Sequence, residues 1–201
     1  RMYVASCLAL LLWPWGALKR LSLHLRARPR MVFSYERQSA DGIEVYTDTD
    51  WAGCPRTRKS TSGGCLMVGR HSIKAWSATQ ASLALSSGEA EYYGAGSATK
   101  EALWLRKMLV DFGLPTPPMS ISTDNQASLS LLKHGAVSPA TKHLSVQYHA
   151  VRNSVIDKLV QFQHISTHEM VADFLTKSLP RPKFDYCLSR FGMAPPSVVS
   201  S

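Results

Sequence analysis

The sequence predicts an α/β fold with a mixed five-stranded sheet, in which three antiparallel strands come first and helices and strands alternate after them. Short segments rich in β-branched, aromatic or other apolar residues at 43–47, 65–68 and 72–77 are separated by polar turns. A long helical pattern of small and apolar residues begins near residue 86. Beyond it, strand and helix patterns alternate as far as residue 178. We therefore expect helices to flank the sheet.

The antiparallel opening is predicted from the turn residues between the strands. A polar loop at residues 54–64, with paired glycines, separates the first strand from the second. The Gly-Arg-His sequence at 69–71 joins the second strand to the third. Such short connections are typical of neighbouring antiparallel strands.

The long helix has a capping box at its start and one stripe of small and apolar residues. Ser86 and Glu89 have the spacing at which a serine hydroxyl and a glutamate satisfy the free amides of a first turn. Glu91 begins the stripe, and small residues such as Gly94 would let the helix approach a sheet closely. A carboxylate directed inward there needs a cation or a hydrogen-bond partner. The alternative, a glutamate that only favours the helix dipole, fits Glu89 better.

In the second half of the domain, predicted strands and helices alternate. We predict strands at 119–123 and 159–165. We predict helices from Asp124–Asn125 to about His134, then at 141–155 and 168–178. Asp124 follows a strand, where ligands gather in α/β sheets, although it also fits an ordinary helix N-cap.

Four acidic residues stand at the end of a strand or in a helix, and they are candidates for a metal site. Asp48 follows the first strand, Glu91 and Asp124 are described above, and Asp173 lies in the last predicted helix. The chain has 14 Asp and Glu against 23 Lys and Arg, so acidic residues in apolar surroundings need an explanation. Mg²⁺ prefers carboxylate oxygens, water and phosphate, and would provide it.

Flanking segments extend the predicted domain at residues 38–179 on both sides. Residues 1–37 are basic, with a helix at 15–25 and a short strand at 31–35, and the turn at 39–42 marks the boundary. Residues 180–201 form an extension, and the pattern-free tail at 194–201 is predicted to be disordered. Because the chain starts with Arg1, we expect a piece of a longer protein.

Charge and cysteine usage limit the class of protein. The net charge is +9, and residues 1–37 hold seven basic residues against one acidic residue. A basic excess favours nucleic acid as a partner, and a solvated positive face is the alternative. The four cysteines show no C-x-x-C or His/Cys ligand spacing, which argues against a disulfide framework and a zinc ribbon. We expect a reducing, intracellular compartment, either a cytoplasmic particle or the nucleus.

The uncharged segment at residues 2–18 raises the question of a membrane span or signal peptide. Pro14 and Gly16 interrupt it, and no A-x-A cleavage pattern follows. We therefore expect no stable membrane association.

Six blocks of sequence resemble, in this order, the ribonuclease H region of copia-type retrotransposon polyproteins. They are YTDTDWAG (46–53), RKSTSG (58–63), ALSSGEAEY (84–92), TDNQ (123–126), TKH (141–143) and ADFLTK (172–177). The resemblance covers residues 43–179 and agrees with the predicted fold. Residues 17–20 and the basic stretch after them look like the end of the reverse transcriptase that precedes this region, which would be a partner within the same polyprotein. Residues 1–15 match it poorly.

The resemblance implies a catalytic role for the same four carboxylates. Asp48, Glu91, Asp124 and Asp173 would hold two Mg²⁺ ions, for which Mn²⁺ can substitute, and hydrolyse a phosphodiester bond by a two-metal mechanism. Asp50 lies two residues from Asp48 and is a competitor for its role. The resemblance also suggests His164 as a histidine that aids proton transfer or product release.

His168 competes with His164, and both histidines also fit an ordinary surface position. Neither alternative is excluded by the sequence.

The implied substrate is an RNA–DNA hybrid, recognised by RNA 2′-hydroxyls in a shallow minor groove and by phosphate contacts. The candidates for contacts with it lie in two polar segments. They are Arg58, Lys59, Ser60 and Thr61, together with Asn125 and Gln126. Three functions remain open: an endonuclease that cuts the RNA strand of hybrids, a catalytically inactive remnant that only binds nucleic acid or acts as a scaffold, and a membrane-anchored protein.

Overall fold

The computed structural model describes residues 2–38, 42–126, 129 and 145–194. The chain divides into two compact units, Arg1–Ser34 with Met193–Ser201, and Tyr35–Gly192. In the first unit, helix α1 spans Met2–Ala27, and the short strands β1 (Val32–Phe33) and β7 (Met193–Ala194) pair antiparallel. Of the helices in the described part of the chain, none has the length and apolar character that crossing a membrane would require.

The second unit is built on a five-stranded mixed sheet with the order β4-β3-β2-β5-β6. Its strands are β2 (Ile43–Asp50), β3 (Thr61–Val68), β4 (His71–Thr79), β5 (Met119–Thr123) and β6 (Gln161–His164). β2, β3 and β4 pair antiparallel, whereas β5 runs parallel to both β2 and β6. This topology confirms the predicted fold class. The strand at 119–123 has the predicted bounds, and β2 continues three residues beyond the predicted end, through Asp50.

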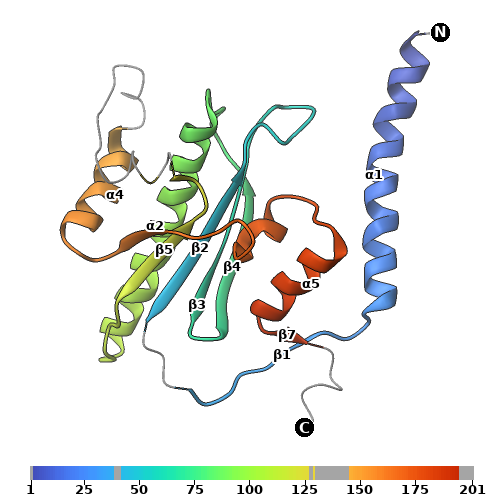
Figure 1. The fold of residues 1–201 in the computed structure, drawn as a ribbon. Coiled ribbons are helices and arrows are strands. Elements are labelled where there is room, and N and C mark those ends of the chain that lie inside the picture. Colours follow the sequence, from blue (N-terminus) through green and yellow to red (C-terminus); the bar gives the residue numbers. More distant parts are fainter. Residues whose placement is uncertain (1, 39–41, 127–128, 130–144, 195–201) are drawn as a thin grey trace. The chain divides into compact units, whose positions relative to one another are not determined.

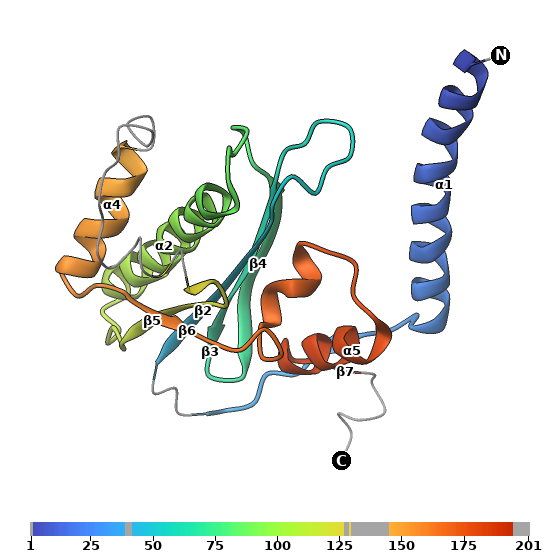
Figure 2. The same ribbon diagram turned by 45° about the horizontal axis from the view of Figure 1, so that its top comes forward.

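Helices cover both faces of this sheet (Figures 1 and 2). Helix α2 (Ser87–Asp111) packs on β2 and β3, and α4 (Ser145–Ile156) packs against α2. On the opposite face lie the short 3-10 helix η2 (Val171–Leu175), against β2 and β3, and helix α5 (Arg181–Arg190), against η2. The sheet is therefore the middle layer of three.

The packing of α2 follows from its start and from its small residues. The amide of Glu89 donates to Ser86 Oγ at 3.1 Å, and the Glu89 carboxylate accepts from the Leu85 amide at 2.8 Å, so the predicted cap forms. A Cβ built at Gly94 would lie 2.5 Å from Thr49 Oγ1, which shows how closely α2 approaches β2. The core between them is apolar, with Val45, Ile121 and the small Ala98 completely buried.

The last helix is predicted incorrectly. The sequence predicts a helix at 168–178, but the structure has only the five-residue 3-10 helix η2. No side chain caps its N-terminus at Met170, and Pro180 cannot continue a helix. No element is predicted after Pro180, but α5 begins there, with a proline in its first turn, a position that proline favours.

Other predictions on the helical segments are tested only in part. α4 begins at Ser145 among the described residues, within the predicted 141–155 segment. The predicted helix from 125 to 134 lies mostly outside the described residues, as do the TKH block and the tail at 195–201.

Candidate active site

Asp48 lies in β2, on the face of the sheet that η2 covers. Side chains alternate along a strand, and the odd-numbered residues of β2, such as Val45, face α2. Asp48 therefore faces the other way, and it is only 3% exposed. Its partner across the ladder is Gly63 in β3. A Cβ at Gly63 would lie 2.7 Å from Thr176 Cγ2, so the missing side chain leaves room for the chain after η2 to reach Asp48.

Two further aspartates meet Asp48. Asp124 directly follows β5, the parallel neighbour of β2, and Asp173 comes from η2. One carboxylate oxygen from each of Asp48, Asp124 and Asp173 lies within 4.8 Å of the other two. Residues separated by more than 120 positions in sequence thus bring three carboxylates together.

Glu91 faces the same place from α2. It lines one cavity with Asp48 and Asp124, although it is not among the three residues with oxygens within 4.8 Å of one another. Burial, and then the charges of Asp48 and Asp124, raise the pKa of Glu91 to about 8, and a hydrogen bond with Asn125 opposes this effect. A neutral carboxylic acid is therefore favoured at neutral pH when no cation is bound.

Asp48 is subject to the same conflict of charges. Burial raises its pKa, while the hydroxyl of Thr176, which donates to Asp48 Oδ2, and the charge of Lys177 lower it. Lys177 Nζ lies 3.5 Å from Asp48 Oδ2 and 3.0 Å from Asp173 Oδ1. The cluster therefore includes a cation from the protein itself.

The cavity at this cluster has a volume of about 530 Å³. Its walls are almost entirely polar. It is lined by Asp48, Thr49, Glu91, Asp124, Asn125, Gln126, His164 and Lys177. The structure thus brings three of the four predicted carboxylates, His164 and the predicted contact residues Asn125 and Gln126 to one opening. Asp173 is 2% exposed and lies behind it, in contact with Lys177.

Asp50 and His168, the alternatives to Asp48 and His164, do not line the cavity. Asp50 is outside the carboxylate cluster, and its carboxylate packs on Gly53, where an added Cβ would lie 1.8 Å from Asp50 Oδ2. His164, the last residue of β6, has its Nε2 3.1 Å from the Asp124 carbonyl oxygen. His168 is exposed and does not line the cavity. The geometry therefore favours Asp48 over Asp50 and His164 over His168.

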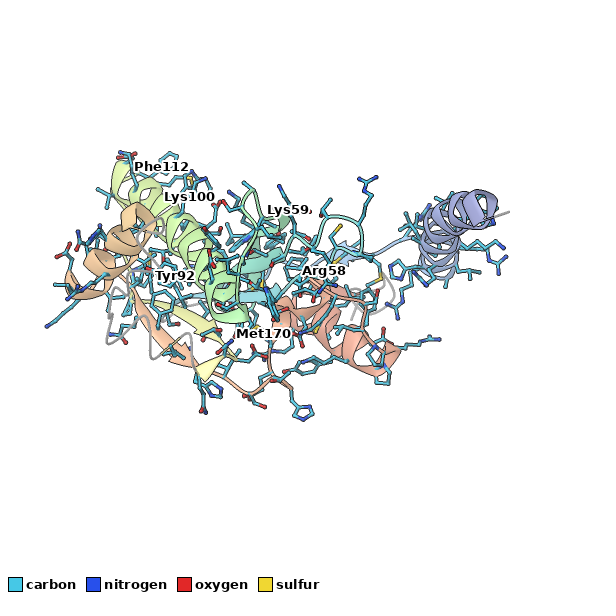
Figure 3. The ribbon with its side chains drawn as sticks, turned by 90° about the horizontal axis from the view of Figure 1, so that it is seen from above. Arg58, Lys59, Tyr92, Lys100, Phe112 and Met170 are labelled. Atoms are coloured by element: carbon cyan, nitrogen blue, oxygen red, sulfur yellow. The ribbon has the colours of Figure 1, made fainter. Side chains whose placement is uncertain are left out.

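The loop between β2 and β3 does not line the cavity. Arg58 and Lys59, labelled in Figure 3, are on this loop, where Arg58 is exposed and Lys59 Nζ donates to the Ala81 carbonyl at 2.7 Å. Thr61 is partly exposed. Ser60 is completely buried, and its Oγ accepts a hydrogen bond from the Ala52 amide at 3.1 Å. Ser60 therefore holds the loop together, and contacts of the other three residues with a substrate stay predictions.

The donor set fits divalent cations. Asp173 Oδ1 is buried and has no hydrogen-bond partner among the described residues, although the ammonium of Lys177 is close to it. Converging carboxylate oxygens, one of them without a hydrogen bond, are the ligands that Mg²⁺ and Mn²⁺ prefer. Asp48, Asp124 and Asp173, with Glu91 beside them, would hold such ions.

Three residues near the carboxylates received no role from the sequence: Thr176, Lys177 and Lys183. Lys183 Nζ, from α5, lies 3.5 Å from Asp173 Oδ2. The four-residue spacing of Asp173 and Lys177 is a signal that identifies a charge pair on a helical turn. Lys183 has no such signal, because its segment was not predicted to be helical.

Comparison with known proteins identifies the family. No protein-family model matches the chain. It is 38% identical over 151 residues to the retrovirus-related Pol polyprotein from transposon TNT 1-94 of Nicotiana tabacum, covering 75% of the chain and 11% of that protein. It is 33% identical over 184 residues to the Pol polyprotein from transposon RE1 of Arabidopsis thaliana, covering 90% of the chain and 13% of that protein. The chain thus spans about an eighth of these relatives.

Solved structures agree on the fold. LC11-RNase H1, isolated from compost by a metagenomic approach, matches with a TM-score of 0.51 and 18% identity, over 74% of this chain and 99% of that one. The same protein in complex with an RNA/DNA hybrid matches with a TM-score of 0.51 and 16% identity, over 67% of this chain and 93% of that one.

The chain belongs to the ribonuclease H-like part of transposon Pol polyproteins. The resemblance found in the sequence is confirmed by the relatives, and the ribonuclease H-like fold is confirmed by the structures. In this ribonuclease H-like domain the carboxylate cluster lies at the carboxyl end of β5, beside the part of β2 that continues past the parallel pairing with β5.

Proposed function

We propose that the domain is an endonuclease that hydrolyses the RNA strand of RNA–DNA hybrids, using two Mg²⁺ ions, as part of a copia-type retrotransposon polyprotein. The observation that supports this most strongly is the convergence of Asp48, Asp124 and Asp173, with oxygens within 4.8 Å of one another, beside Glu91. The match to a ribonuclease H that was crystallised with an RNA/DNA hybrid supports the choice of substrate.

The carboxylates would bind and orient the cations. When bound, the ions activate water for attack on the phosphodiester and stabilise the leaving 3′ oxygen. Asp48 shares the ammonium of Lys177 with Asp173, and one of its oxygens lies within 4.8 Å of an oxygen of Asp124. Its Oδ2 accepts a hydrogen bond from the hydroxyl of Thr176, which helps to orient the carboxylate.

Residues at the rim of the cavity would bind the substrate and assist proton transfer. Asn125 and Gln126 supply amide groups that can bind 2′-hydroxyl or phosphate oxygens. His164 lies at the opening, and its imidazole nitrogens can donate a proton to a reacting group or accept one from it. Its contact with the Asp124 carbonyl oxygen orients the ring when Nε2 carries the proton.

The test uses the purified full chain and a labelled RNA–DNA hybrid. We expect RNA cleavage that requires Mg²⁺ or Mn²⁺ and falls below detection in Asp124→Asn. Asp50→Asn is the matched control, because it makes the same chemical change two residues from Asp48 but outside the cluster. Cleavage that persists in Asp124→Asn, or is lost equally in Asp50→Asn, would contradict the proposed site.

A second candidate is a nucleic-acid-binding domain without catalytic activity. The observation in its favour is the ammonium of Lys177, which lies between two of the carboxylates. If the wild type and Asp124→Asn bind the hybrid equally and neither cuts it with Mg²⁺ or Mn²⁺, this second function replaces the first.

A further inference from the structure

The two carboxylate oxygens of Asp173 face two different lysines. Lys177 Nζ lies 3.0 Å from Oδ1, and Lys183 Nζ lies 3.5 Å from Oδ2. Asp173 is almost completely buried, so both contacts act at reduced dielectric. A metal ion that binds an oxygen of Asp173 therefore has to compete with at least one of these ammonium groups.

Lys183 is held in place by other groups. Its ammonium donates to the carbonyl oxygens of Thr167 at 2.7 Å and His168 at 2.6 Å, and it lies 5.4 Å from the ring centre of Tyr186. These partners fix the ammonium independently of Asp173. Lys183 therefore acts as a positioning residue, which keeps Oδ2 occupied and leaves Oδ1 as the oxygen available to a ligand.

Lys177 is held differently. Its ammonium bridges Asp173 Oδ1 and Asp48 Oδ2, but Oδ1 still has no partner with hydrogen-bond geometry among the described residues. Its side chain is 39% exposed, against 21% for Lys183, and it lines the cavity. A flexible side chain that is attracted by charge and open to solvent can move outward when a stronger cation arrives.

We propose that the ammonium of Lys177 is the resident cation of the metal-free site, which holds Asp48 and Asp173 together and is displaced when a divalent ion binds. This inference rests on the metal site of the proposed function, and it gives Lys177 a role in how tightly that site binds its first ion. In the metal-free domain the ammonium offsets the repulsion between the two buried carboxylates. The same ammonium competes with the incoming ion and weakens its binding.

The direct test is a calorimetric titration of the full chain with Mn²⁺, without nucleic acid. Lys177→Met keeps the length of the side chain and removes its charge. We expect it to bind the first Mn²⁺ at least about tenfold more tightly than the wild type, because one competing cation is gone. Lys177→Arg keeps the charge, so its affinity should stay close to the wild type.

Two variants control for a general effect of charge. Lys107→Met makes the same change in net charge on an exposed part of α2, and Lys183→Met removes the anchored ammonium on the other oxygen of Asp173. Lys107→Met should leave Mn²⁺ binding unchanged. Lys183→Met should tighten it by less than Lys177→Met, because Lys183 lies farther from its Asp173 oxygen and does not line the cavity. Equal tightening in Lys177→Met and either control, or unchanged affinity in Lys177→Met, would overturn the proposal.

Thermal unfolding provides a second readout that a purely structural lysine would not give. In EDTA, Lys177→Met should unfold at a lower temperature than the wild type, because two carboxylates lose their shared cation. Saturating Mn²⁺ should raise its Tm by more than it raises the wild-type Tm. A Tm deficit of equal size in both conditions would overturn the proposal. These readouts do not use hybrid cleavage, so a domain that binds Mn²⁺ as expected but cuts no RNA would contradict the proposed function alone.

Discussion

The carboxyl group of Glu91 is held where its charged form is disfavoured. Burial in the start of α2 and the nearby charges of Asp48 and Asp124 raise its pKa to about 8. In an unfolded chain the group would ionise near its usual value of 4.5. Folding of the metal-free domain therefore keeps a proton that the unfolded chain releases between these two pH values.

This difference predicts how stability depends on pH. The contribution of Glu91 to stability is fully present below pH 4.5 and is lost as the pH rises to about 8. In EDTA, Glu91→Gln should therefore be more stable than the wild type at pH 8, by about 4 kcal/mol, and should lose this advantage near pH 4. Urea unfolding of both proteins at the two pH values measures the effect.

Glu89→Gln is the control for this experiment, because Glu89 lies in the same first turn but is less buried than Glu91 and does not line the carboxylate cavity. The glutamine variant at position 89 should show the wild-type dependence on pH. If the wild type and Glu91→Gln lose stability in parallel as the pH rises, Glu91 does not hold a raised pKa in the folded domain.

At the level of elements, the site depends on how closely η2 approaches β3. Gly63 is the point of contact, since an added Cβ would lie 2.7 Å from Thr176 Cγ2 and 2.9 Å from Leu175 Cβ. The same approach places Thr176 against Asp48 and Asp173 beside it. Contacts that assemble the site are thus also packing contacts.

Gly63→Ala should push η2 away from the sheet. We expect a loss of about 1–3 kcal/mol of stability, the usual effect of overpacking, and weaker Mn²⁺ binding because Asp173 moves with η2. Chemical denaturation and calorimetry measure the two effects. Gly16→Ala, in helix α1, where an added Cβ meets nothing within 4 Å, should not lower stability and should leave Mn²⁺ binding unchanged. Normal Mn²⁺ affinity in Gly63→Ala would show that the approach of η2 is not needed for the site.

Helix α5 gives a second prediction at this level. It buries Cys187 and Leu188, with Phe191 buried just after its end, and it supplies Lys183 to Asp173. A chain that stops after Leu179 should lose about 3 kcal/mol or more of stability, since several buried side chains disappear together. A chain that stops after Gly192 is the control. Equal stability of the two would support a domain that ends at residue 179.

At the level of the whole molecule, the chain has a net charge of +9, whereas its candidate site is a cavity lined by carboxylates. The positive charge favours a polyanion, and the carboxylates repel it unless cations intervene. Nucleic acid should therefore be attracted by the surface and accepted at the site only with divalent ions.

Binding of the hybrid should weaken steeply as salt increases, because bound phosphates release counterions. With Ca²⁺ present to limit cleavage, Arg58→Gln should reduce the slope of log K against log[salt] by about 1 if Arg58 contacts a phosphate. Fluorescence anisotropy at several salt concentrations measures it. Arg106→Gln, a change on α2 far in sequence from the loop, is the control. An unchanged slope in Arg58→Gln would exclude this contact.

Much of the fold could be predicted from local patterns. The strand at 119–123 and the cap of α2 at Ser86 depend on neighbouring residues, so the sequence predicts them well. The prediction of a helix at 168–178 was wrong, because packing on β3 leaves only a five-residue 3-10 helix, η2, in this segment despite its helical sequence pattern. α5 was missed because its pattern is weak and its stability comes from tertiary burial.

By itself, the sequence determined the family, the order of the five sheet strands along the chain and the start of helix α2, because these depend on local periodicity and on six ordered blocks. Only the tertiary structure decided that Asp48, not Asp50, joins Asp124 and Asp173, and that Lys177 lies among them. The physical reason is that these contacts join residues up to 129 positions apart in sequence, and their geometry depends on the register of β2 with β3 and on the packing of η2.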